Sequence, residues 1–120
     1  MAVSRRLPAV GVLVLLAACS SPQSAQERAE SQELAQLAPL KSQYPDVVMG
    51  FDFHGTTADV SVDLNEEIQM DDAKEDAMRA EAVRDWRQAW MRAHPHQHAH
   101  LLLRILDFRG NVSWKATTSA

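Results

Sequence analysis

Two runs of alternating apolar and polar residues restrict what this chain can fold into. Within VVMGFDFH (residues 47–54) the apolar side chains recur at every second position, and TADVSVDLN (residues 57–65) repeats the pattern. Such alternation is typical of strands with one buried face, because successive side chains of a strand point to opposite sides. A Gly-Thr pair separates the two runs. We therefore expect an antiparallel β-hairpin, with Phe51 and Phe53 facing the core.

A helix is expected next, ending before Pro95, because proline lacks a backbone N–H and clashes with the preceding turn. From residue 73 onward, apolar residues recur in steps of three or four, which places them along one side of a helix. We expect Trp86 and Trp90 to be buried against the sheet as core anchors. The apolar stripe consists of Ala73, Ala77, Ala80, Val83, Trp86, Trp90 and Ala93.

Two further strands follow the helix. The segment AHLLLRILDF (residues 99–108) is apolar enough for a central strand, and VSWKA (residues 112–116) alternates, with Trp114 directed inward. The element order is β-β-α-β-β. We predict a small α+β domain of two layers, in which a four-stranded, mainly antiparallel sheet has one helix packed on one face and a polar second face.

The aromatic residues set the limits of this domain. All of them lie between Tyr44 and Trp114, so we predict one packed domain over residues 44–117 and a short tail over residues 118–120. Such a domain has a core of marginal size.

The first eighteen residues have the layout of a secretory signal. Arg5 and Arg6 precede an uncharged apolar run over residues 7–18. This run is too short to span a bilayer, which takes about 20 apolar residues. Residues 1–18 are therefore expected to be removed on export.

The run ends in Leu16-Ala17-Ala18-Cys19, which resembles the lipobox of bacterial lipoproteins, Leu-small-small-Cys. The resemblance implies cleavage before Cys19, thioether lipidation of its sulfur and acylation of its new amino group. Cys19 is the only cysteine in the chain. Ordinary signal cleavage nearby, which would leave a soluble periplasmic protein, is the alternative.

Lipidation has consequences for location and stability. In the lipoprotein family, sorting depends partly on the residue after the cysteine, and Ser20 is not the aspartate associated with retention at the inner membrane. The resemblance therefore implies the outer membrane, facing the periplasm. Two or more acyl chains anchor a protein stably. With Cys19 lipidated, no cysteine remains for a disulfide, so the fold depends on packing alone.

Residues 19–43 are expected to form a polar tether from the lipid to the domain. The segment is rich in Ser, Gln, Ala and Glu and contains no aromatic residue. Such segments cannot bury enough apolar surface to offset the entropy lost on ordering. Leu34 and Leu37 are too few to require a packing partner, so we expect the tether to be partly helical or disordered.

The charge of the mature chain excludes one class of partner. Removal of residues 1–18 leaves 10 basic and 16 acidic side chains, a net charge of −6. Binding to nucleic acid or to anionic headgroups requires clustered Lys and Arg. We therefore expect no nucleic-acid partner, and membrane association through the lipid on Cys19 alone.

Four histidines, His94, His96, His98 and His100, fall within the seven residues HPHQHAH. If the segment is extended, the last three point to one side and could share Zn, Cu or Ni. The pattern has no thiolate or carboxylate partner at a fixed spacing, although structural zinc normally takes four ligands. The alternative is that His94 caps the helix and the other three are solvated.

Asp52 and His54 form a second candidate pair, two residues apart on the polar face of the first strand. Such a pair could act as an acid and a base or hold a metal, but a solvated strand face explains it equally well. The sequence contains no Gly-rich phosphate loop, nucleophile elbow, HExxH or cysteine-metal motif.

These observations predict a membrane-anchored envelope lipoprotein that is not an enzyme and needs no cofactor. Its domain would act as a binding or assembly module for an envelope protein. The alternative is a periplasmic metal-binding or metal-delivery lipoprotein that uses His96, His98 and His100, with His94 or His54.

Overall fold

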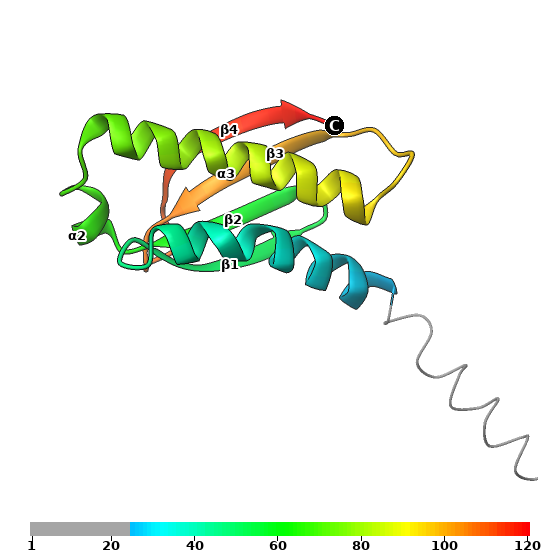
Figure 1. Cartoon of the computed structure of the whole chain (residues 1–120), viewed down its shortest axis with the longest axis horizontal. Helices are drawn as coiled ribbons and strands as arrows, with labels where there is room; N and C mark the ends of the chain where they lie inside the picture. The colour runs from blue at the N-terminus through cyan, green and yellow to red at the C-terminus, as the bar shows by residue number, and fades with distance from the viewer. Residues whose placement is uncertain (1–24) are drawn as a thin grey trace, which may run out of the picture.

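The computed structural model describes residues 25–120. Residues 25–43 are helical and are called here the N-terminal helix. The remaining elements follow in the predicted order β-β-α-β-β, with one short additional helix, and they form a small α+β domain (Figure 1). Their bounds are β1 Val48–His54, β2 Thr57–Val62, α2 Leu64–Glu67, α3 Asp72–Ala93, β3 His100–Leu106 and β4 Val112–Ser119.

The four strands form one sheet in the order β1-β2-β3-β4. The outer pairs, β1 with β2 and β3 with β4, are antiparallel hairpins, whereas the central pair β2 and β3 is parallel. A parallel pair needs a long crossover, and α3 supplies it by carrying the chain back along the helical layer. The predicted sheet, mainly antiparallel, is confirmed, and its centre is the exception.

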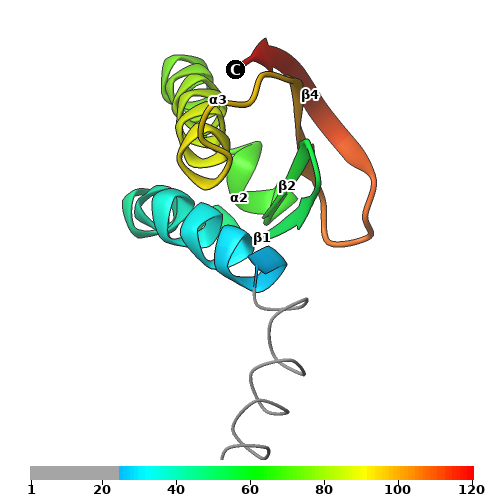
Figure 2. The ribbon, with the colours of Figure 1, turned by 90° about the vertical axis from the view of Figure 1, so that its right-hand side faces the viewer.

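Two helices, and not one, cover the same face of the sheet (Figure 2). α3 lies against β3 and β4, and the N-terminal helix lies on the β1 side. No described helix covers the opposite face, which is the polar face expected from the alternation of the strands.

The N-terminal helix corrects the predicted tether, because residues 25–43 belong to the packed domain. Leu37 and Leu40 are fully buried, and Glu33 on the same side of the helix is only 3 % exposed. Positions separated by three and four residues share one helix face, so a few apolar residues suffice to close the core between β1 and α3. The helix is also tied to α3 by a hydrogen bond of 2.7 Å from Arg92 Nη1 to Gln36 Oε1.

The domain also extends further at its other end than predicted. β4 continues to Ser119, and the backbone N–H of Ala120 donates to the carbonyl oxygen of Ala99 over 2.9 Å. Residues 118–120 are therefore part of the sheet edge and not a tail. Continued ladder hydrogen bonding explains this, because it requires no apolar side chain and leaves no signal in the alternation.

Trp86 and Trp90 are buried in the core, as expected. The first half of the predicted stripe is wrong, because Ala73, Ala77 and Ala80 are exposed. Each step of three residues falls about 60° short of a full helical revolution, so three such steps in a row drift off the buried face. The buried face of α3 consists of Met78, Ala82, Trp86, Ala89 and Trp90.

The three other expected core anchors, Phe51, Phe53 and Trp114, are half-buried and pack on the edge of the core. The Phe53 ring stacks on Trp86 with centroids 5.6 Å apart. A β-bulge between residues 48 and 50 shifts the alternation of β1. Met49 is therefore 57 % exposed, and Val48 is buried in its place.

Candidate functional site

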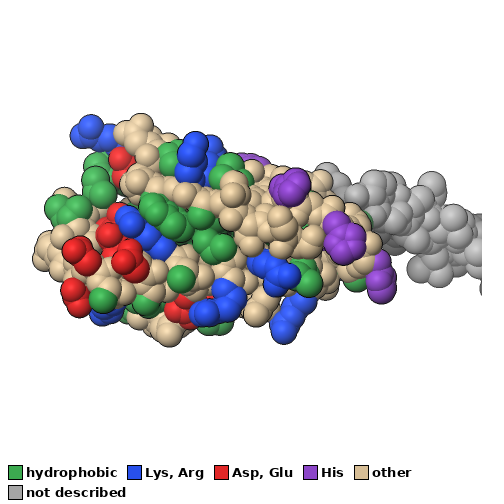
Figure 3. All heavy atoms as spheres, turned by 90° about the horizontal axis from the view of Figure 1, so that it is seen from above, with side chains coloured by type: hydrophobic (Ala, Val, Ile, Leu, Met, Phe, Trp, Pro, Cys, Tyr) green, Lys and Arg blue, Asp and Glu red, His purple; other side chains and the backbone are tan. Residues whose placement is uncertain are grey.

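Histidine side chains gather at one end of the described part of the molecule (Figure 3), and three histidines of residues 94–100 contact different groups. His94 stacks on Trp90, with ring centroids 4.5 Å apart, and its Nδ1 lies 3.1 Å from the carbonyl oxygen of Trp90. The Nδ1 atom of His98 lies 3.3 Å from the carbonyl oxygen of Ala120, and that of His100 lies 3.2 Å from the hydroxyl of Ser119.

The extended backbone on which the same-side arrangement of His96, His98 and His100 depended is not present. β3 begins only at His100, and His96 has the left-handed φ of 66°. The alternation of an extended strand therefore does not apply before residue 100. Within residues 25–120, no group of three or more His, Cys, Asp or Glu side chains is arranged to hold a metal ion.

The predicted lipidation site, Cys19, lies outside the described residues. Within residues 25–120 no helix combines the length and the apolar character needed to cross a membrane.

The uncovered face of the sheet carries a network of charged and titratable side chains from three strands. Arg104 of β3 donates from Nε to Asp59 Oδ1 over 2.7 Å and from Nη2 to Asp59 Oδ2 over 2.8 Å. His54 places Nε2 3.1 Å from Asp52 Oδ2 and 3.5 Å from Asp59 Oδ2. Asp52 and His54, which the sequence placed on one polar face, are thus brought together.

The pair of Asp59 and Arg104 fixes charge in position. The Asp59 side chain is only 6 % exposed, and a buried carboxylate is tolerated when it is paired and hydrogen-bonded. Hydrogen bonding to Asp59, together with its negative charge, raises the pKa of Arg104. The guanidinium engages both oxygens of Asp59, so the two side chains hold each other in place.

The sheet register places these charges in one row across the four strands. Asp52 pairs with Asp59, Asp59 with Arg104, and Arg104 with Lys115. The acidic end is accessible, because the Asp52 side chain is 71 % exposed, and Lys115 is exposed at the basic end. The row therefore presents a negative pole over β1 and a positive pole over β4.

A shallow hollow adjoins the positive pole. It has a volume of about 480 Å³. Apolar and basic side chains therefore meet on the part of this face that β3 and β4 form. The lining residues are Leu102, Arg104, Val112, Ser113, Trp114 and Lys115.

Sequence reasoning missed the roles of Asp59 and Arg104. The sequence marks each residue separately as a charge within an apolar stretch. Arg104 interrupts the run LLLRIL, and Asp59 lies between apolar residues. Their pairing joins residues 45 positions apart, and it depends on the parallel contact of β2 with β3. No local pattern reports that contact.

Comparison with known proteins adds no relative. No family model, no curated protein and no solved structure matches the chain.

Proposed function

We propose that this protein is a non-enzymatic lipoprotein of the bacterial envelope, anchored through Cys19, which docks a protein partner on the uncovered face of its sheet. The resemblance of Leu16-Ala17-Ala18-Cys19 to a lipobox supports the anchor. The fixed row of charges across β1 to β4 is the observation that supports docking. Both expectations extend the sequence prediction of a tethered binding or assembly module.

The charge row determines the chemistry of the partner. Complementary potentials across an interface give orientation and suppress wrong partners. A partner of this face carries basic groups opposite Asp52 and acidic groups opposite Lys115. An apolar side chain on the partner fills the hollow beside Leu102. Because Asp59 is already neutralised by Arg104, the outer positions determine specificity.

Site-specific photo-crosslinking in intact envelopes tests this proposal. A photoreactive phenylalanine replaces Thr117, which pairs with Leu102 and is exposed, and a control places it at exposed Arg84 on α3. We expect one discrete adduct from position 117 and none from position 84.

The charge requirement supplies the second arm of the experiment. Lys115→Glu should remove the adduct at position 117, because it reverses the positive pole. Lys74→Glu, a matched change of an exposed lysine on α3, should leave the adduct unchanged. Equal adducts from positions 117 and 84, or an adduct insensitive to Lys115→Glu, would show that the sheet face is not the docking surface.

A further inference from the structure

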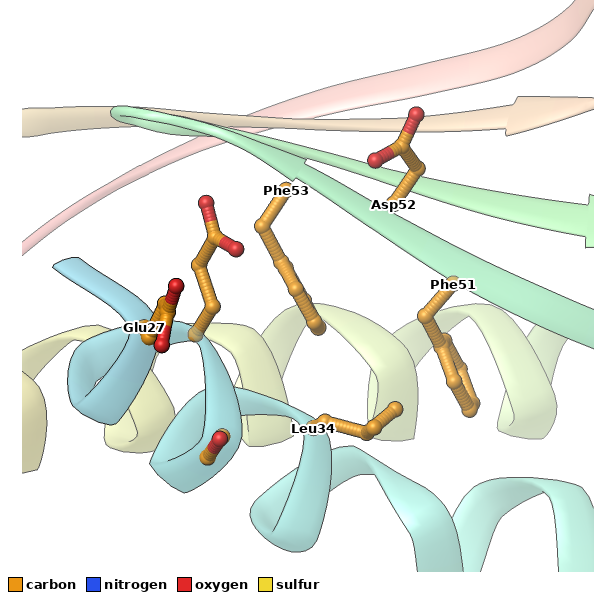
Figure 4. A pocket seen from close by; sticks show the side chains of 7 residues that line it. Glu27, Leu34, Phe51, Asp52 and Phe53 are labelled. Carbon is orange, nitrogen blue, oxygen red and sulfur yellow. The ribbon is translucent and has the colours of Figure 1, made fainter. Parts of the chain in front are cut away.

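A groove runs between the N-terminal helix and β1, away from the uncovered sheet face. In Figure 4, Phe51 and Phe53 extend from β1 toward the helices, and Asp52 between them points the other way. Leu34 of the N-terminal helix lies below the two rings and is 48 % exposed. Glu27, Glu30, Ser31 and Asp52 complete the lining of this first hollow, which has a volume of about 410 Å³.

A second hollow continues the groove toward the end of α3. It has a volume of about 460 Å³ and shares Glu30 and Phe53 with the first. The combined groove thus brings apolar side chains together with the carboxyl groups of Glu27, Glu30 and Glu33, which all lie on the N-terminal helix. The further lining residues of the second hollow are Ala25, Gln26, Ala29, Glu33, Gly55, Ala93 and His94.

Glu33 distinguishes this groove from an ordinary acidic surface. Its side chain lines the second hollow, yet the residue is only 3 % exposed, and its Oε2 atom has no hydrogen-bond partner. A buried carboxylate oxygen without a partner costs free energy. A donor bound in the groove beside Glu33 would supply the hydrogen-bond partner that Oε2 lacks.

No Lys or Arg is among the residues that line the second hollow beside Glu33. Its own helix contributes Glu30, which accepts a hydrogen bond from Gln26 Nε2 over 3.3 Å. β1 contributes Phe53 and the turn after it contributes Gly55, which carry no charge, and the end of α3 contributes Ala93 and His94. Arg92 of α3 donates to Gln36.

We propose that this groove binds the ammonium group of an alkylamine, with the ammonium on Glu33 and Glu30 and the apolar stem along Phe53, Phe51 and Leu34. An ammonium has three donors and no acceptor, which suits two carboxylates. An apolar stem suits the aromatic and aliphatic side chains of Phe53, Phe51 and Leu34. The same chemistry occurs in free diamines and in lysine side chains.

A divalent metal fits the groove less well than an ammonium. Within the described chain, no three His, Cys, Asp or Glu side chains converge to hold a metal ion. Hard cations such as Ca²⁺ take six or more oxygen ligands. Two carboxylates beside aromatic rings match a single positive charge that carries an apolar chain.

Binding should depend on pH through Glu33. Burial, followed by the charge of Glu30, raises the pKa of Glu33 to about 7. An ammonium binds the ionised carboxylate, and this form is a minor species at pH 6 and the main one at pH 8. The affinity should therefore rise roughly tenfold between pH 6 and pH 8.

Calorimetry with 1,5-diaminopentane on the full-length chain in detergent tests the proposal. At pH 8 we expect one site, which Glu33→Gln weakens roughly tenfold or more, because a charge-assisted hydrogen bond is lost. Glu67→Gln is the matched control, since Glu67 is also buried with an unpartnered Oε2 but lies in α2. It should change the affinity less than twofold.

The neutral analogue 1,5-pentanediol has the same stem and should not bind. A wild-type readout does not depend on any variant: the ¹³C shift of the Glu33 carboxyl should show its pKa falling when the diamine is bound. His94→Phe keeps an aromatic ring beside Trp90 and should preserve the pH dependence.

The two sources of the ammonium are separated by a parallel titration with Nα-acetyl-lysine methylamide. Tighter binding of this compound assigns the site to a lysine side chain of a peptide, and tighter binding of the diamine assigns it to a free amine. Absence of binding by both, equal binding of the diol, or an affinity unchanged by Glu33→Gln would overturn the proposal.

Discussion

At the scale of single residues, two buried carboxyl groups link the stability of the fold to pH. The pKa of Glu33 is raised from 4.5 to about 7 by burial and then by Glu30. The pKa of Glu67 is also raised, by burial and then by Glu75, with Arg79 opposing. In both cases the carboxyl group ionises at a lower pH in the unfolded chain than in the folded chain. The free energy of unfolding therefore falls as pH rises from the unfolded pKa through the folded pKa of each group.

Glu33→Gln tests this linkage. Near pH 4 the carboxyl of Glu33 is mainly protonated and therefore uncharged, as is the glutamine of the variant. The variant and the wild type should then have similar free energies of unfolding. As pH rises from 4.5 through about 7, only the wild type loses the contribution of Glu33, whereas both proteins lose that of Glu67. The variant should therefore be more stable than the wild type at pH 8 by on the order of 2 kcal/mol. Urea unfolding at the two pH values measures the difference. A gap of the same size at pH 4 and pH 8 would contradict the assignment.

At the scale of elements, the N-terminal helix is the part of the fold that was hardest to predict from the sequence. The hairpins could be predicted because alternation and turn residues are local signals, and α3 could be predicted from the spacing of its apolar residues and from Pro95. The helical residues 25–43 contribute only Leu37 and Leu40 as fully buried apolar side chains. Their importance depends on the space between β1 and α3, which exists only after the sheet has formed.

The candidate sites show the same difference between local sequence signals and tertiary contacts. Asp52 and His54 were found because two residues of one strand face share a side by geometry. The arrangement of the histidines of residues 94–100 could not be predicted in this way, because the left-handed backbone of His96 breaks the alternation. The contact of Asp59 with Arg104 and the burial of Glu33 are tertiary events between segments that are distant in sequence.

A comparison of two leucines tests the role of the N-terminal helix. Leu37→Ala removes a fully buried side chain and should lower the free energy of unfolding by about 2 to 5 kcal/mol. Leu34→Ala, on the same helix, should change it by less than about 0.5 kcal/mol, because the side chain is 48 % exposed. Equal effects in chemical denaturation would show that the helix is a tether and not part of the core.

At the scale of the whole molecule, the packed helix changes what a lipid anchor would mean. Helical structure is described from residue 25, so only residues 20–24 separate it from Cys19. Such a segment spans at most about 18 Å when fully extended. Under the proposed function, the domain is therefore held close to the membrane surface, and a partner must approach the uncovered sheet face near the membrane.

The anchor itself is tested most directly by metabolic labelling with a clickable palmitate analogue. The account predicts that the wild-type chain is labelled and that Cys19→Ser is not. Cys19→Ser combined with Ser24→Cys, which keeps one thiol at a shifted position, should also remain unlabelled. Equal labelling of the wild type and Cys19→Ser, or no labelling of either, would contradict the proposal that this protein is a lipoprotein of the bacterial envelope.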